Sequence, residues 1–195
     1  MAGAVYETET IEQIRAASGA GDVVHAGTFF GDFLPAIATA LAPSARVWAF
    51  EPNPNSARCA RVTCELNGLD NVALAEAALS RTAGDVSFVV EDLEGAPLGG
   101  ASHVGESKGA LSVETQAIDE VIPQDRHVTV IHLDVEGHEV EALEGALETI
   151  ARCRPLLLVE TCPEADWLAE NLAPLGYAIT GQVCKNTILT SARAE

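Results

Sequence analysis

Short apolar runs alternate with helical patterns along most of the chain, and this alternation leaves few folds open to it. Runs such as 22–26 (DVVHA), 46–51 (RVWAFE) and 128–134 (VTVIHLD) have the length of strands, and amphipathic segments follow them. Parallel strands need long crossover connections, which are usually helices, so this order is typical of an α/β domain. We therefore expect a mostly parallel sheet with helices on both faces.

The other predicted elements complete a single domain over residues 1–195, because no linker or internal repeat divides the chain. Residues 91–110 are Gly-rich and polar and predict one long loop. Further strands are expected at 72–76, 85–90, 111–117 and 155–160 and as a terminal pair near 177–189, and helices at 31–42, 55–67, 139–151 and 164–173.

Charge and hydropathy exclude several classes of function. The chain has 11 basic and 29 acidic side chains and a formal net charge of −18, which disfavours binding to nucleic acid or to an anionic membrane surface. Apolar residues make up 48% of the chain, yet no apolar run reaches the roughly 20 residues that a membrane span needs. No basic-then-apolar leader opens the chain, so a cytoplasmic protein is expected.

The cysteines are an odd number and form no CxxC pair, which fits neither a disulfide framework nor a zinc site. We expect reduced, mostly buried thiols. They are Cys59, Cys64, Cys153, Cys162 and Cys184.

The turn after the first strand, HAGTFFGDF, places Gly27 and Gly31 between a strand and a helix. Glycine lets backbone N–H groups approach a ligand, and a helix N-terminus favours negative charge, so the turn suits a carboxylate or a phosphate. Glu51 ends the second strand 20 residues after Gly31, the spacing at which dinucleotide folds place an acid on ribose hydroxyls. The glycines alone are explained equally well by a bend in the chain, and Glu51 alone by a solvated strand end. The two features together favour a nucleoside ligand.

The residues of this turn restrict which nucleoside-containing ligand fits. The nicotinamide fingerprint GxGxxG is absent because position 29 is Phe, so a ligand without phosphates fits better. S-adenosylmethionine has ribose hydroxyls for Glu51, a carboxylate for the turn, and an adenine that fits against small residues such as Ala77 and Ala78. A nicotinamide-dependent oxidoreductase remains the alternative, since it shares the Glu51 argument.

Ionisable residues crowd the end of one apolar strand, in VIHLDVEGHEVEALEGA at 130–146. Asp134 falls at the carboxyl end of the strand, where open α/β sheets bind ligands. Glu136 and the next glutamate fit the N-terminus of the following helix, where negative charge is stabilised. We interpret His132 as a hydrogen-bonded core histidine. His138 begins the helix at the mouth of the cleft and is the better catalytic candidate.

Glu160 closes the next strand, beside Asp134 if the strand order is the usual one. Two carboxylates on adjacent strand ends suit a hard cation such as Mg²⁺. They are explained equally well as two solvated strand ends, so the metal site formed by Asp134 and Glu160 stays one of two interpretations.

Taken together, these motifs resemble the FkbM-type S-adenosylmethionine-dependent methyltransferases, which have the class I methyltransferase fold. The resemblance covers residues 22–160. It implies a Rossmann-like, mostly parallel seven-stranded sheet with a reversed last strand, and O-methylation of a hydroxyl on a small-molecule or sugar acceptor. The matching pieces are VVHAGTFFGDF at 23–33, FEPNP at 50–54, AALS at 77–80, IHLDVEGHEVEALEGA at 131–146 and RPLLLVE at 154–160.

The resemblance also implies roles for individual residues, transferred by position. Asp134 and His138 are the catalytic candidates, with Asp134 near the transferred methyl group and Glu136 and His138 on the acceptor side. The residues expected to contact the cofactor are Gly27, Thr28, Phe29 and Gly31 at its methionine part, Glu51 at its ribose, and Pro52 and Asn53 beside its adenosine.

One position departs from the family pattern. Family members usually carry an acid and then V-G-A-N in the first motif, where this chain has His25 and then AGTF. The acid normally helps to hold the cofactor's ammonium group, and the nearest acids here are Asp22 and Asp32. The departure motivates a second hypothesis, a non-catalytic binding or assembly module on the same fold. The acceptor pocket is expected from the 91–110 loop, the C-terminal hairpin or a second subunit of a homo-oligomer.

Overall fold

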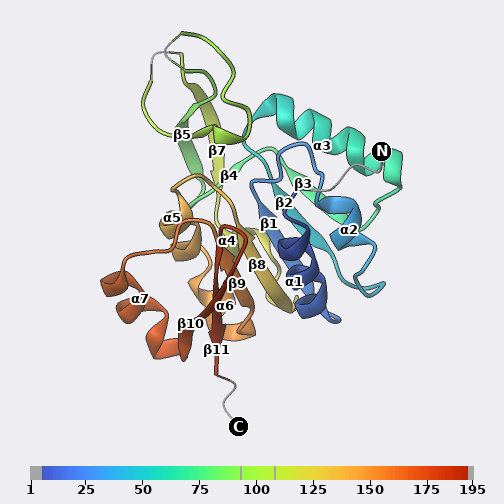
Figure 1. Cartoon of the computed structure of the whole chain (residues 1–195), viewed down its shortest axis with the longest axis vertical. Coiled ribbons are helices and arrows are strands. Elements are labelled where there is room, and N and C mark those ends of the chain that lie inside the picture. Colours follow the sequence, from blue (N-terminus) through green and yellow to red (C-terminus); the bar gives the residue numbers. More distant parts are fainter. Residues whose placement is uncertain (1–5, 93, 108, 193–195) are drawn as a thin grey trace.

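The main sheet of the computed structural model has seven strands in the order β10-β11-β9-β8-β1-β2-β3 (Figure 1). The structure describes residues 6–92, 94–107 and 109–192; the ends of the predicted domain and two positions of the predicted loop lie outside this range. The strands are β1 (Asp22–Ala26), β2 (Val47–Phe50), β3 (Val72–Ala75), β8 (Val128–Leu133), β9 (Leu156–Val159), β10 (Tyr177–Val183) and β11 (Asn186–Ser191).

All neighbouring strands from β3 to β9 pair in parallel, and only β11 runs against both of its neighbours. The predicted α/β fold with a mostly parallel sheet and a reversed last strand is therefore confirmed. Because β1 and β8 are central neighbours, their carboxyl ends meet at one edge of the sheet, which is where this topology binds ligands.

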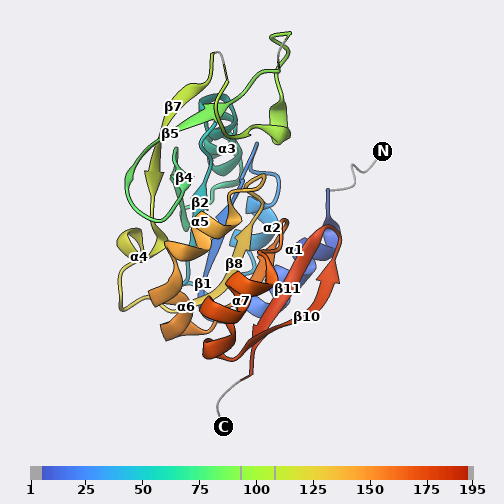
Figure 2. The ribbon, with the colours of Figure 1, turned by 90° about the vertical axis from the view of Figure 1, so that its left-hand side faces the viewer.

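Helices cover both faces of the sheet (Figure 1, Figure 2). One face carries α1 (Thr8–Ser18), α2 (Leu34–Ala38) and α3 (Pro54–Asn67). The other carries α4 (Ile118–Val121), α5 (Glu139–Glu144), α6 (Leu147–Cys153) and α7 (Ala165–Asn171). Two short 3-10 helices are η1 (Gly99–Ala101) and η2 (Ala173–Leu175).

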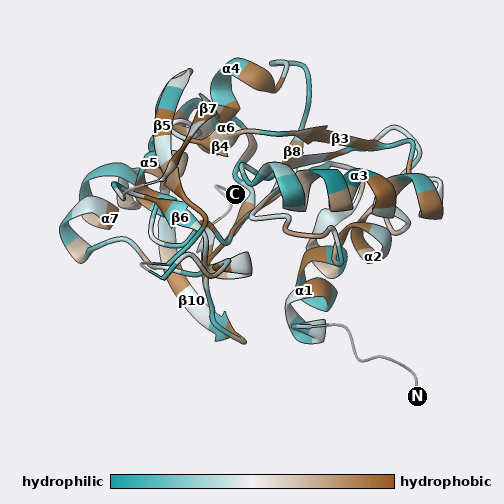
Figure 3. Ribbon diagram, turned by 90° about the horizontal axis from the view of Figure 1, so that it is seen from above, coloured by the Kyte–Doolittle hydropathy of each residue, from teal (hydrophilic) through white to brown (hydrophobic). Residues whose placement is uncertain are grey.

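Alternate residues of each central strand pack into different halves of the core. Val23 of β1 and Val130 of β8 belong to the half under α1 to α3, whereas Val24 and Ile131 belong to the half under α4 to α7. A strand that is buried on both faces must be apolar at nearly every position, which explains the continuous apolar runs in the sequence. The helices, in contrast, alternate hydrophobic and hydrophilic residues in Figure 3.

A second, four-stranded sheet lies beyond the carboxyl ends of the main strands, at the top of Figure 1. Its strands are β4 (Ala78–Leu79), β5 (Gly84–Val89), β6 (His103–Val104) and β7 (Leu111–Gln116), in the order β4-β7-β5-β6. The prediction of one long loop at 91–110 is wrong over 99–104, because η1 and β6 form there and β6 pairs with β5.

The helix predicted at 139–151 is broken at Gly145. A Cβ atom at Gly145 would lie 2.1 Å from the backbone oxygen of Ser80, so the chain passes very close to another segment here. The carboxylate of Asp119 then caps α6, accepting hydrogen bonds from the N–H groups of Glu148 (2.9 Å) and Thr149 (2.8 Å). A cap supplied from a distant segment leaves no local signal in the sequence.

Two further expectations need correction. The helix α1 was not expected, because the start of the chain reads as polar and acidic. The cysteines are free, but they are not mostly buried: only Cys153 is buried, Cys184 is exposed, and the other three are half-buried. Within the described ranges, no helix combines the length and apolar character needed to cross a bilayer.

Candidate functional site

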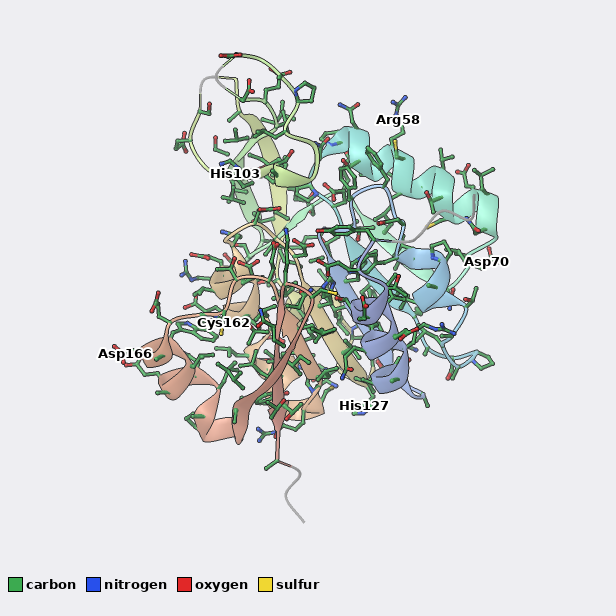
Figure 4. The ribbon with its side chains drawn as sticks, in the orientation of Figure 1. Arg58, Asp70, His103, His127, Cys162 and Asp166 are labelled. Atoms are coloured by element: carbon green, nitrogen blue, oxygen red, sulfur yellow. The ribbon has the colours of Figure 1, made fainter. Side chains whose placement is uncertain are left out.

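A cavity of about 460 Å³ opens at the carboxyl ends of β1, β2 and β8. Its walls come from both sheets, since the ends of the main strands face Phe88 of β5 and the segment 99–104. In Figure 4 this segment, marked by His103, lies at the upper end of the molecule, and His127, just before β8, lies at the lower end. The cavity is therefore at the edge of the sheet where the topology predicts a ligand.

Most of the site residues that the sequence predicted line this cavity. So do 99–102 and Val104 of the predicted loop and Lys185 at the tip of the C-terminal hairpin, two of the sources expected for the pocket wall. The predicted residues in the lining are Gly27, Phe29, Glu51, Pro52, Ala77, Ala78, Asp134, Glu136, His138 and Glu160.

Three predicted cofactor residues lie outside the lining and have contacts within the fold. Thr28 is buried and donates from Oγ1 to the backbone oxygen of His25 (3.1 Å). Asn53 is the N-cap of α3, where its Oδ1 accepts from the N–H of Asn55 (3.0 Å). Gly31 packs against α3, so that a Cβ there would come within 3.2 Å of the Cα of Ala60.

Gly27 brings two strands together. Its φ is +78°, and a Cβ at this position would lie 1.8 Å from the backbone oxygen of Asp134 at the end of β8. Its N–H is already bonded to the oxygen of Phe50 (3.1 Å), so this N–H is not free for a ligand. The glycine is required for a close backbone approach, as the sequence predicted, but the approaching group is β8.

Glu51 is the most strongly held polar group of the cavity wall. It is only 5% exposed; its Oε1 accepts from the N–H of Asn53 (2.8 Å) and its Oε2 from the N–H of Phe29 (2.7 Å). Burial raises the pKa of Glu51 to about 7, against the lowering effect of the two N–H groups. Each carboxylate oxygen has a second lone pair, so the group can still accept hydrogen bonds from two hydroxyls.

Three carboxyl groups of the cavity lining meet just after the ends of β8 and β9. Oxygens of Asp134, Glu136 and Glu160 lie within 4.8 Å of one another. Burial, and then the neighbouring Glu160, raises the pKa of Asp134 to about 8. Lys185 adds a positive charge, with its Nζ 3.5 Å from Oε1 of Glu160. Hard oxygen donors in this number match the preferences of Mg²⁺ or Ca²⁺.

His138 has contacts to both ring nitrogens. Its Nδ1 lies 3.5 Å from a carboxylate oxygen of Glu141, and its Nε2 lies 3.3 Å from the hydroxyl of Ser80. Since a carboxylate accepts hydrogen bonds, the proton of the neutral ring is on Nδ1 and the lone pair is on Nε2. Burial lowers the pKa of His138, which keeps the ring neutral and able to accept a proton.

Two buried histidines form part of the cavity lining. His132 is 1% exposed, and its Nε2 lies 3.1 Å from Oδ1 of Asn186, which confirms it as a hydrogen-bonded core histidine. Its Nδ1 lies 2.8 Å from Nδ1 of His25, and the His25 ring stacks on Phe33 at a centroid distance of 5.3 Å. The sequence singled out His25 only as a departure from a motif, whereas in the structure it lines the cavity.

The two acids nearest to the missing motif acid lie on opposite sides of it: Asp22 begins β1, and Asp32 follows the turn after β1. Asp22 accepts from Nε1 of Trp48 (2.8 Å), pairs with Arg126 and does not line the cavity, so it does not replace the motif acid. Asp32 lines the cavity, and burial raises its pKa.

The raised pKa values predict how stability depends on pH. A carboxyl that binds its proton more tightly when folded makes the folded state less stable as the pH rises through its folded pKa. That loss extends to about pH 7 for Glu51 and about pH 8 for Asp134. The buried histidines have pKa values below 6.5 and oppose the trend only below that pH. A net decline in the stability of the folded state is therefore expected between pH 6.5 and 8.

Asp134→Asn is expected to flatten that decline, because the amide does not titrate. Urea denaturation of both chains in EDTA, at intervals across this pH range, measures the slope. A decline of the same steepness in the variant would contradict the assignment of the effect to Asp134.

Comparisons with known proteins agree with this geometry. A family model described as "Methyltransferase FkbM domain" matches residues 19–175 of the chain. A solved structure, methyltransferase FkbM from Methylobacillus flagellatus KT, has a TM-score of 0.59 and 17% sequence identity, over 87% of this chain and 43% of that one. At this identity the match speaks for the fold alone.

Two curated proteins are similar in sequence. The 2-O-methyltransferase NoeI of Sinorhizobium fredii is 29% identical over 130 residues, which cover 58% of this chain and 53% of NoeI. The hexuronic acid methyltransferase AglP of Haloferax volcanii is 31% identical over 105 residues, 52% of this chain and 41% of AglP. The chain thus matches about half the length of these relatives.

Proposed function

The chain belongs to the FkbM methyltransferase family, and from this premise we propose that it transfers the methyl group of S-adenosylmethionine to a hydroxyl of a small molecule or sugar. The names of two relatives, a 2-O-methyltransferase and a hexuronic acid methyltransferase, support an oxygen acceptor on a sugar-like compound. The observation that carries the proposal is Glu51, a buried carboxylate in the cavity wall with lone pairs to spare.

The residues of the cavity fit this cofactor. Glu51 would accept hydrogen bonds from the two ribose hydroxyls, and the small side chains of Ala77 and Ala78, which also line the cavity, would leave room for a flat base. When bound, the cofactor supplies an electrophilic methyl group on a sulfonium centre. The protein has to align the acceptor oxygen and remove its proton.

His138 is the proposed general base. It is neutral and lines the cavity, and its Glu141 contact directs the lone pair to Nε2, where the acceptor hydroxyl would replace the hydroxyl of Ser80 as the donor. Asp134 lies in the same wall and orients the acceptor hydroxyl; with a pKa of about 8 it holds its own proton at neutral pH and is the weaker candidate for the base.

His138→Asn is therefore expected to lower kcat on the order of 10²–10⁴-fold, with cofactor affinity essentially unchanged. His103→Asn is the matched control, because His103 lies in the same region but outside the cavity lining. Steady-state kinetics with a hydroxylated acceptor measures the effect. Equal kcat values for the two variants would remove His138 as the base.

A non-catalytic module would be favoured by a cleft filled by Phe29 and Phe30. Instead Phe30 is 48% exposed, and the Phe29 ring stacks on it at 3.8 Å and leaves the cavity open. Calorimetry with S-adenosylhomocysteine is the direct test: micromolar to millimolar binding is expected, and no binding at millimolar ligand would refute the proposal. An NADH fluorescence titration run in parallel tests the oxidoreductase alternative.

We also propose a divalent cation at Asp134, Glu136 and Glu160, where it would displace the proton of Asp134 and lower the pKa of the acceptor hydroxyl. The support is the convergence of three carboxyl groups within 4.8 Å. Turnover is expected to fall in EDTA and to return with Mg²⁺, and Glu160→Gln is expected to abolish this response. Undiminished turnover in EDTA would remove the cation from the reaction.

A further inference from the structure

We propose that His25 accepts a hydrogen bond from the ammonium group of the bound cofactor through the lone pair on its Nε2, and that Glu7, Asn186 and His132 keep that lone pair in place. The inference rests on the proposed function, because it takes S-adenosylmethionine as the ligand. It makes His25 the functional replacement for the acid that the first motif lacks, and it adds one residue to the proposed cofactor-binding site.

The argument starts outside the cavity, at Glu7. Its Oε2 lies 3.0 Å from Nδ2 of Asn186 and also accepts from Oγ1 of Thr10 (2.9 Å). An amide NH₂ can only donate, and the carboxylate is its acceptor, so the orientation of the Asn186 amide is determined. Its carbonyl oxygen must therefore be the atom that faces His132.

The same reasoning places the protons on both histidines. The Asn186 oxygen, 3.1 Å from Nε2 of His132, is an acceptor, so the His132 proton is on Nε2 and its Nδ1 carries a lone pair. That Nδ1 lies 2.8 Å from Nδ1 of His25, which must then donate. Because both rings are buried and burial keeps His25 uncharged, its remaining nitrogen, Nε2, has a lone pair and no proton.

Because Nδ1 of His25 is turned toward His132, Nε2 is the ring nitrogen left for the cavity. The ring is 2% exposed, stacked on Phe33, and part of the cavity lining. Among the residues that the structure describes, no group lies at hydrogen-bonding distance from Nε2. A ligand that fills the cavity would exclude solvent from this acceptor, so it must supply a hydrogen-bond donor there to avoid leaving the nitrogen unpaired.

The position of His25 selects the ammonium end of the cofactor. In the sheet order β3-β2-β1-β8, Glu51 at the end of β2 and the alanines after β3 take the nucleoside, which leaves the amino-acid end beside β1. His25 and Asp32 are the acceptors there. An ammonium has three N–H donors and no acceptor, so it matches a cavity wall that offers a bare imidazole nitrogen and a carboxyl group.

The first test examines the protons on His25 and needs no activity. Histidine ¹⁵N spectra of the whole chain without ligand are expected to show His25 protonated on Nδ1 and His132 on Nε2. Saturating S-adenosylhomocysteine should shift the bare Nε2 resonance of His25 without changing its tautomer. Asn186→Leu, which leaves the cavity lining unaltered, should produce mixed tautomers. A proton on Nε2 of His25 in the unaltered protein would overturn the proposal.

The second test compares S-adenosylhomocysteine with its analogue in which hydrogen replaces the α-amino group. The unaltered chain is expected to bind the analogue on the order of tenfold to a hundredfold more weakly. In His25→Phe the ratio of the two dissociation constants, analogue over parent compound, should fall sharply. The variant loses affinity for the parent compound and keeps its affinity for the analogue. Asp32→Asn is the comparison variant. If this ratio of dissociation constants falls in Asp32→Asn and is unchanged in His25→Phe, the ammonium is bound by Asp32 and the proposal is overturned.

The outcomes of these tests distinguish a failure of the His25 proposal from a failure of the proposed function. No binding of S-adenosylhomocysteine by the unaltered chain would refute the proposed function and this inference with it. Binding without a shift of the His25 resonance would refute the inference and leave the function standing. If His25→Phe does not fold, the spectra of the unaltered chain decide.

Discussion

Gly27→Ala is expected to lower the free energy of unfolding by about 2–5 kcal/mol. Two costs combine at this position. A left-handed φ of +78° is unfavourable for any residue with a Cβ, and the Cβ itself would lie 1.8 Å from the backbone oxygen of Asp134. Backbone cannot rotate away as a side chain can, so β1 and β8 must separate or the turn must deform. Urea denaturation measures the change.

Gly68→Ala is the matched control. Gly68 ends α3 with a φ of +62°, and no atom lies within 4 Å of its missing Cβ, so the variant has the conformational cost without the collision. A loss of about 1–2 kcal/mol is expected there. Equal losses in the two variants would show that the strand ends accommodate a methyl group, and the close-approach explanation of Gly27 would then be wrong.

Glu51→Gln is expected to weaken S-adenosylhomocysteine binding on the order of a hundredfold or more. Above pH 7, where Glu51 is ionised, hydrogen bonds to a charged acceptor are lost. An amide group also has only one acceptor atom for the N–H groups of Phe29 and Asn53, so its NH₂ must face one of these donors. The cavity wall thereby loses both the ribose contact and its own support. Calorimetry measures the affinity, and denaturation shows whether the variant is folded.

Glu76→Gln controls for the loss of one negative charge near the cavity. Glu76 directly precedes Ala77, but its carboxylate is exposed and paired with Arg61 at 2.9 Å. Its replacement is expected to leave the affinity essentially unchanged. A comparable loss in both variants would mean that Glu51 acts through general charge and not through direct contact, and the central support for the proposed function would fall.

Much of the fold could be predicted because its central strands are buried on both faces. That burial requires apolar runs such as VTVIHLD, and a polar residue at the end of such a run marks the carboxyl edge of the sheet. Glu51, Asp134 and Glu160 were all identifiable in this way, and all three line the cavity.

Other features had no local signal. The break in the helix at Gly145 depends on the Ser80 backbone and on a cap from Asp119, which are far away in the sequence. Contributions to the cavity from Tyr6 and Phe88 depend on where α1 and the small sheet pack. A pattern within one segment cannot report contacts between segments, so these positions carried no motif.

The amino-acid sequence therefore determined which residues end the strands, since apolar periodicity is a local property of the chain. It also determined the chemistry available there: carboxylates, imidazoles and glycines. The tertiary structure decided what each one contacts. It turned Gly27 toward β8, brought three carboxyl groups within 4.8 Å, and joined Glu7 to His25 through Asn186 and His132. Hydrogen bonds and pKa shifts depend on distance and burial, and these are set only when the sheet and its helices have packed.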